Sequence, residues 1–174
     1  LAVENGLSTV VQLSVVGSYM FSLGRSQIQE GYFPHNNTIN VFDPDFVSYA
    51  DGWAKTNLKY QDYDRLIGYM SDNELPIDID MLDRSLSVIY QKEVYEKEVN
   101  LYTYACAWTW LINMTGKEAP STADITDELR DLYRGFVYDR YYSVVTPAIK
   151  KYDPNHMYLG TKYLNEVKES NGRI

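Results

Sequence analysis

The sequence predicts an α/β protein built on a parallel sheet, and two observations lead to this prediction. Three short runs resemble strands, at 9–16, 66–72 and 157–163, and segments with a helical spacing of apolar residues separate them. The second run is almost continuously apolar, as in a strand that is buried on both faces. Because strands joined through helices run parallel, we expect all three to end at one edge of a sheet whose two faces are covered.

The first strand and the helix after it have clear local signals. The first run, "TVVQLSVV", is rich in β-branched residues and is bounded by Gly17. A helix is expected over 42–58, where Asp43 is a candidate N-cap and Pro44 suits the first turn. The apolar residues of this segment recur at helical spacing: Phe46, Tyr49, Ala50 and Trp53.

A long helical segment separates the second strand from the third. We interpret about 78–151 as an insertion, with one helix over 79–91 and another over 96–114. A third helix is expected around 129–145, where apolar residues recur at positions i, i+3 and i+4. Because proline lacks an N–H group and crowds the preceding turn, Pro147 is expected to kink or end this helix.

Composition and charge narrow the class of protein. Residues 1–174 are 45% hydrophobic and 23% charged, which suits a single globular domain with a substantial core. Sixteen basic residues against 24 acidic ones give a net charge of −8, which opposes binding to nucleic acid. No apolar run reaches the roughly 18 residues that a membrane-spanning helix needs. The chain begins at Leu1 without a signal-peptide pattern, and we expect it to be part of a longer protein.

The motifs point to no cofactor and no metal. Glycine-rich phosphate loops of the Walker or dinucleotide kind do not occur in the sequence, nor do HExxH, CxxC or EF-hand patterns. The two histidines, His35 and His156, have no partner at metal-ligand spacing, and we interpret His156 as structural. Cys106 is the single cysteine, so an intrachain disulfide is impossible.

The second strand ends on polar groups, which raises the possibility of a site. Asp72, Asn73 and Glu74 follow the apolar run, and Pro76 halts it. Sites in α/β folds lie at the carboxyl ends of the strands, where Glu74 is expected. Burial raises the pKa of a carboxyl group, which suits a general acid near neutral pH. An Asn amide suits hydrogen bonding to a sugar hydroxyl. From these residues alone, a catalytic site and a surface loop are equally good interpretations.

Three segments in order resemble the motif set of the retaining glycoside hydrolases of clan A. They are "NVFDPDF" (40–46), "RLIGYMSDNELPI" (65–77) and "YDPNHMYLGTKY" (152–163), and the similarity is to β-agarase-like and β-galactosidase-like members in particular. The resemblance covers about 39–163. It implies a partial (β/α)8 TIM barrel of about strands 3 to 5, with the long helical insertion after strand 4.

The same resemblance implies roles for individual residues. The acid/base Glu of that superfamily follows an Asn at the end of strand 4, which corresponds here to Glu74 and Asn73. Thr161 and Lys162 end the strand 5 candidate and are candidate substrate-binding residues, although the family more often carries Arg in place of Lys162. His35, in the loop after the first strand, is a further candidate for contact with substrate.

Other residues near the predicted site have simpler expected roles. Strand alternation points Asp72 away from Asn73, and we expect it to have a structural hydrogen-bonding role. Ser18 and Tyr19 follow the first strand and are candidates for the rim of the cleft.

The implied function is that of a glycoside hydrolase fragment. The resemblance implies retaining hydrolysis of β-glycosidic bonds in an agar-type galactan or another β-galactoside, by a secreted, cell-surface or periplasmic protein without a cofactor. The nucleophilic Glu of the family lies at the end of strand 7, outside this chain, so the isolated fragment is expected to be inactive. The alternatives are a non-catalytic carbohydrate-binding or degenerate barrel protein, and a complete small α/β domain in which Glu74 lies on an ordinary loop.

Overall fold

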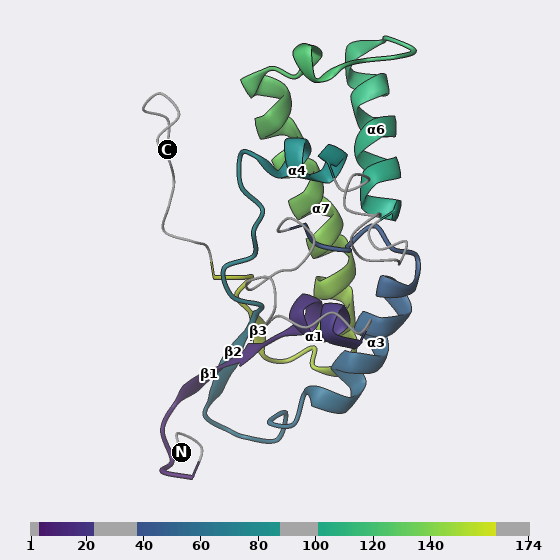
Figure 1. Cartoon of the computed structure of the whole chain (residues 1–174). Coiled ribbons are helices and arrows are strands. Elements are labelled where there is room, and N and C mark those ends of the chain that lie inside the picture. The colour runs from purple at the N-terminus through teal and green to yellow at the C-terminus, as the bar shows by residue number, and fades with distance from the viewer. Residues whose placement is uncertain (1–3, 23–37, 88–100, 163–174) are drawn as a thin grey trace.

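The structure is a computed structural model that describes residues 4–22, 38–87 and 101–162 (Figure 1). The predicted alternation of strands and helices is confirmed. The elements in chain order are β1 (Thr9–Leu13), α1 (Val15–Ser22), α3 (Asp45–Asn57), β2 (Leu66–Ser71), α4 (Met81–Ser87), α6 (Leu101–Thr115), the 3-10 helix η2 (Thr122–Asp124), α7 (Asp127–Tyr152) and β3 (Met157–Tyr158).

The three strands form one parallel sheet in the order β1-β2-β3, which confirms the predicted strand direction. β1 pairs with β2 from Thr9 to Leu13, and β2 pairs with β3 through Gly68 and Tyr69. Because the strands are parallel, their carboxyl ends share one edge of the sheet. The spatial order follows the chain order, as it does for consecutive strands of a barrel.

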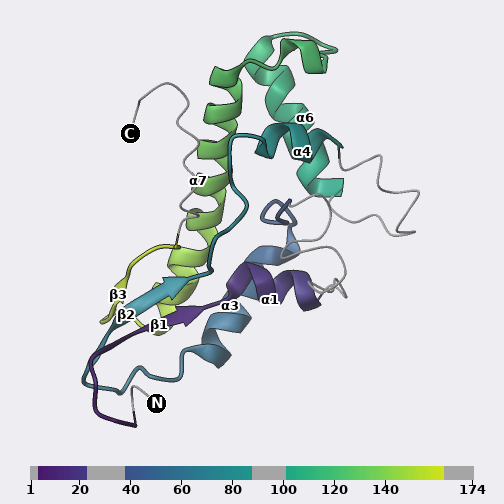
Figure 2. The same cartoon turned by 60° about the vertical axis from the view of Figure 1, so that its left-hand side comes forward.

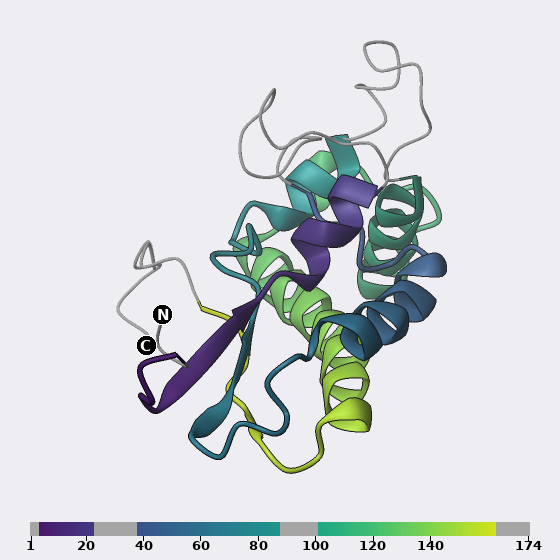
Figure 3. The same ribbon diagram turned by 90° about the horizontal axis from the view of Figure 1, so that it is seen from below.

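The helices that pack on the sheet lie on one side of it. Figures 2 and 3 show α3 and α7 on the same side of the three strands. In the described part of the chain this differs from the expectation of two covered faces. A sheet that curls into a barrel carries helices on its outer face alone, because its inner face is filled by side chains of the other strands.

The first strand is shorter than predicted. β1 ends at Leu13, while Val15 and Val16 begin α1 and Gly17 lies within that helix. Both valines are 1% exposed. Their burial in the core outweighs the preference of β-branched residues for strands, which is a weak and context-dependent preference.

The insertion is largely helical where the structure describes it. α6 and α7 form an antiparallel hairpin that extends away from the sheet (Figure 1). The hydroxyl oxygen of Thr126 accepts a hydrogen bond from the N–H of Leu129 and caps α7. No helix in the described ranges is both long and apolar enough to cross a membrane.

α7 continues through Pro147 to Tyr152, so of the two expected effects of this proline, a kink or the end of the helix, the second is wrong. The turns around Pro147 are held by packing, since Val145, Ala148 and Ile149 are buried in the core. The apolar area that they bury outweighs the loss of one helical hydrogen bond.

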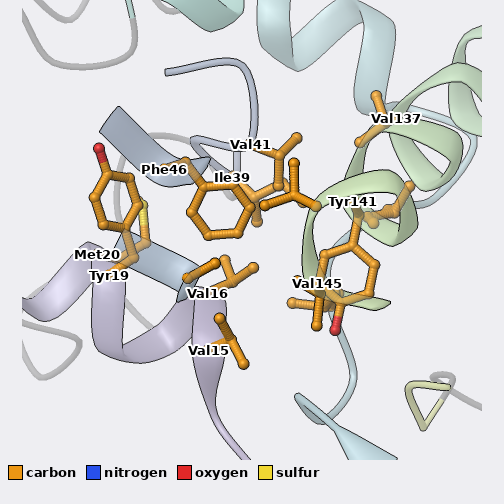
Figure 4. Packing of buried hydrophobic residues seen from close by; sticks show 14 of the residues in the cluster. Val15, Val16, Tyr19, Met20, Ile39, Val41, Phe46, Val137, Tyr141 and Val145 are labelled. Atoms are coloured by element: carbon orange, nitrogen blue, oxygen red, sulfur yellow. The ribbon is translucent and has the colours of Figure 1, made fainter. Parts of the chain in front are cut away.

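The buried residues form one core cluster, which extends from α1 and α3 along α7 to α4 and α6. Tyr19 is 3% exposed, and its ring centroid lies 5.2 Å from that of Phe46 and 4.9 Å from that of Tyr49. Tyr19 is therefore a core residue and not part of a cleft rim. Figure 4 shows the residues of α1 and α3 facing those of α7 across the core: Val15, Val16, Tyr19, Met20 and Phe46 opposite Val137, Tyr141 and Val145.

Candidate active site at the carboxyl edge of the sheet

The carboxyl edge of the sheet brings together four of the five predicted site residues. Asn73 pairs with Lys162 in an isolated parallel bridge, and the N–H of Glu74 donates to the carbonyl oxygen of Lys162 at 2.8 Å. Thr161 lies directly beside Lys162 in the chain. His35, the fifth predicted residue, lies outside the described residues. Their functional roles stay predictions.

The side chains of Glu74 and Lys162 contact each other at this edge. The Lys162 Nζ donates to Glu74 Oε1 at 2.9 Å; the side chain of Lys162 is 54% exposed and that of Glu74 is 38% exposed. An ion pair of this exposure stabilises a fold by less than about 1 kcal/mol. The contact places the carboxylate of Glu74 beside the Lys162 ammonium group, within reach of solvent.

The backbone around Glu74 has an uncommon conformation. Asp72 has φ 51° and Glu74 has φ 53°, so both lie in the left-handed region that non-glycine residues seldom adopt. Each such residue costs roughly 1–3 kcal/mol and persists only where its surroundings hold it. Conformations of this kind cluster at active sites and ligand-binding sites. Asp72 itself is a weak signal of this conformation, since Asp adopts this region more readily than most residues do.

Asp72 is buried beneath the site. Its side chain is 2% exposed, and its Oδ1 accepts hydrogen bonds from the N–H groups of Val16 at 3.0 Å and Gly17 at 3.4 Å. Its Oδ2 accepts from the hydroxyl of Tyr141 at 2.9 Å. Burial raises the pKa of Asp72 to about 6, and these hydrogen bonds oppose the rise. The structural hydrogen-bonding role predicted for Asp72 is confirmed.

A cluster of hydroxyl groups extends from Asp72. The oxygens of Ser71 and Tyr141 lie 2.6 Å apart, and Ser71 also hydrogen-bonds to Tyr158. Burial, followed by the nearby charge of Asp72, raises the pKa of Tyr141 far above its usual range. Tyr141 is therefore a neutral phenol whose hydroxyl donates a hydrogen bond to the carboxylate of Asp72. Sequence reasoning missed Tyr141, because a helical pattern shows which face is buried but not which distant residue that face meets.

Thr161 is better suited to support the site than to bind substrate. Its side chain is 5% exposed, and its hydroxyl donates to the carbonyl oxygen of Asp72 at 3.2 Å. This bond ties the chain after β3 to the end of β2. Asn73 is half-buried and stays a candidate for contact with a sugar.

A separate polar cluster lies near the amino end of β3, away from the candidate site. Asp153 accepts a hydrogen bond from the hydroxyl of Tyr69 at 2.7 Å and lies 2.8 Å from Nδ1 of His156. These contacts agree with the structural role expected of His156. Among the residues that the structure describes, no group of three or more His, Cys, Asp or Glu is placed to hold a metal ion.

Comparison with known proteins shows similarity of fold. No family model matches the sequence, and no curated protein is significantly similar to it. The fold is, however, similar to part of a solved glycoside hydrolase. That structure is BpGH50, of glycoside hydrolase family 50, with a TM-score of 0.69 and 21% sequence identity over 90% of this chain and 33% of that chain. The chain thus shares its α/β fold with part of BpGH50 and spans about a third of the length of that protein.

Proposed function

We propose that this chain is the part of a retaining glycoside hydrolase that supplies the general acid/base, Glu74. It would form about strands 3 to 5 of a (β/α)8 barrel. The observation that carries the proposal is the position of Asn73-Glu74 just after β2, at the carboxyl edge of a parallel sheet. Glu74 has a left-handed backbone, and its N–H is bonded to the carbonyl oxygen of Lys162. The fold similarity to BpGH50 supports the same class of enzyme.

The proposed reaction has two steps that use Glu74 in turn. In the first step, the Glu74 carboxyl group protonates the glycosidic oxygen while a second carboxylate, about 5–5.5 Å away, attacks the anomeric carbon. In the second step, Glu74 accepts a proton from the water that releases the sugar. The nucleophilic carboxylate belongs to a part of the protein outside these 174 residues. Asn73 and Lys162 would hydrogen-bond to sugar hydroxyls, and Thr161 would hold their backbone.

The proposed substrate is an agar-type galactan or another β-galactoside. It follows from the resemblance of the three sequence segments at 40–46, 65–77 and 152–163 to β-agarase-like and β-galactosidase-like enzymes. Because a polysaccharide is too large to enter a cell, the proposal includes a secreted, cell-surface or periplasmic location.

The test is the Glu74→Gln substitution in the protein that carries this chain. Turnover of agar-type oligosaccharides, measured as new reducing ends, should fall by about 10²–10⁴-fold, because the substitution removes proton transfer. Asp51→Asn is the matched control: Asp51 is 40% exposed, it pairs with Lys151 Nζ at 2.7 Å, and it lies on α3, away from the strand ends. Asp51→Asn should leave turnover unchanged.

Two outcomes would overturn the proposal. Full activity of Glu74→Gln would exclude the acid/base role. Binding of galactan by the unaltered protein without any hydrolysis would favour the alternative, a non-catalytic carbohydrate-binding protein.

A further inference from the structure

We propose that Asp72 and Tyr141 form a buried positioning pair that fixes the orientation of Glu74. This inference rests on the acid/base role proposed for Glu74. It concerns two residues that would never touch substrate, because Asp72 is 2% exposed and Tyr141 is fully buried.

Four separate parts of the chain hold Asp72. Its N–H donates to the carbonyl oxygen of Leu13 in β1 at 2.9 Å, and its carboxylate accepts from the N–H of Val16 in α1 and from the hydroxyl of Tyr141 in α7. Its carbonyl oxygen accepts from the hydroxyl of Thr161, after β3. Every polar group of Asp72 thus has a partner, and this set of partners holds its left-handed backbone.

The constraint on Asp72 extends to the reacting group. Glu74 is two residues further along, also left-handed, and its N–H is bonded to the carbonyl oxygen of Lys162. Thr161, which bonds to Asp72, precedes Lys162, whose Nζ contacts the Glu74 carboxylate at 2.9 Å. A movement of Asp72 would therefore displace both Glu74 and its partner lysine. Misplacing a catalytic group by about 1 Å can lower a rate by about 10²-fold.

Tyr141 links this site to the insertion. It lies on α7, the 26-residue helix that runs from the hairpin with α6 to the amino end of β3. Its oxygen lies 2.9 Å from Asp72 Oδ2 and 2.6 Å from Ser71 Oγ, so it contacts the last residue of β2 and the residue after it. Tyr141→Phe removes this hydroxyl and keeps the ring that packs in the core.

The test compares two substrates of different leaving-group ability. A dinitrophenyl β-galactoside expels its leaving group without a proton, whereas a galactose disaccharide needs the acid. In the protein that carries this chain, Tyr141→Phe should lower kcat/KM for the disaccharide by about 10–100-fold and change kcat/KM for the dinitrophenyl substrate by less than about threefold. A role in stability alone would lower both values by the same factor.

Two further variants, Tyr69→Phe and Glu74→Gln, serve as references for the effect of Tyr141→Phe. Tyr69→Phe is the matched control, because Tyr69 is also fully buried and donates to a buried carboxylate, Asp153, near the amino end of β3. It should affect both substrates equally. Glu74→Gln should show a larger difference between the substrates than Tyr141→Phe does.

The possible results separate this inference from the proposed function. If Glu74→Gln affects both substrates equally, the acid/base role is wrong. If Glu74→Gln separates the substrates and Tyr141→Phe does not, the positioning role is wrong and the acid/base role stands. Should Tyr141→Phe fail to fold, Asp72→Asn, which keeps an acceptor for the N–H of Val16, undergoes the same comparison with the same two outcomes.

Discussion

At the scale of residues, the buried carboxyl of Asp72 makes stability depend on pH with a defined sign. Burial raises its pKa from the ordinary 3.8 to about 6. The folded protein therefore binds this proton more tightly than the unfolded chain does. The resulting stabilisation is complete below the unfolded pKa and is lost as the pH rises through the folded pKa.

The Asp72→Asn variant isolates the contribution of Asp72 to the free energy of unfolding. The free energy of unfolding of the unaltered protein minus that of Asp72→Asn should fall between pH 4 and pH 7, by roughly 3 kcal/mol for a pKa shift of this size. Denaturant unfolding at several pH values measures it. A difference that does not change with pH would contradict the account of Asp72.

Other carboxyl groups change the stability of the fold in a lower pH range than Asp72 does. A hydrogen bond from Lys151 lowers the pKa of Asp51. Burial raises the pKa of Asp153, but hydrogen bonds from Tyr69 and His156 outweigh it and leave that pKa lowered. Groups with a lowered folded pKa stabilise the fold above their unfolded pKa and lose that stabilisation as the pH falls through the folded pKa, below 3.8. The pH range in which these groups change the stability lies below the range in which Asp72 does.

Substitutions of Lys162 test whether its contact with Glu74 matters for catalysis, without a large change in the stability of the fold. Lys162→Met removes the 2.9 Å contact with Glu74, so we expect kcat/KM on oligosaccharide to fall by about tenfold or more. The free energy of unfolding should change by less than about 1 kcal/mol, because the pair is exposed. Lys162→Arg keeps a cationic donor and should retain more activity than Lys162→Met. Equal activity of the two variants would show that the contact with Glu74 has no role in catalysis.

The sequence predicted the meeting of Glu74 and Lys162, because residues that follow parallel strands share one sheet edge. It did not predict the partner of Asp72. Tyr141 is 69 positions away in the chain, and nothing in local spacing connects the two.

At the scale of elements, Gly68 permits the close approach of β2 and β3. A Cβ at Gly68 would lie 2.1 Å from the carbonyl oxygen of Met157, a backbone atom that cannot move aside alone. Gly68→Ala should therefore lower the free energy of unfolding by about 2 kcal/mol or more. Thermal or denaturant unfolding measures the change.

Gly52→Ala is the control for Gly68→Ala. Gly52 lies within α3, and a Cβ there would meet nothing within 4 Å. Alanine favours a helix interior over glycine by about 0.8–1 kcal/mol, so this variant should be more stable than the unaltered protein. Similar effects of the two substitutions would show that β2 and β3 do not approach as closely as the structure has them.

The boundaries of the elements were harder to predict than their existence. β2 and α3 were predicted because an apolar run and a capped amphipathic pattern each leave a local signal. α1 was missed because Val15 and Val16 continue the pattern of β1 while their burial places them in a helix. α7 continues past Pro147 for the same reason, since tertiary packing outweighs a local preference.

At the scale of the whole molecule, the chain corresponds to about a third of BpGH50, and the proposed enzyme needs a second carboxylate from elsewhere. We therefore predict that the 174 residues alone hydrolyse no β-galactoside. The two outer strands of the sheet, which no further strand covers within the described ranges, should also make them prone to aggregate. Turnover by the purified 174 residues that disappears in Glu74→Gln would contradict this prediction.

The role of Glu74 is tested most directly by the product of a Glu74→Ala variant of the protein that carries this chain, supplied with a dinitrophenyl β-galactoside and azide. Without a general base, water releases the glycosyl-enzyme slowly, whereas azide attacks it without needing a base. Our proposal for Glu74 predicts that azide restores turnover and that the product is the β-galactosyl azide, with the configuration of the substrate. Failure of azide to restore turnover, or an α-galactosyl azide product, would contradict the acid/base role of Glu74.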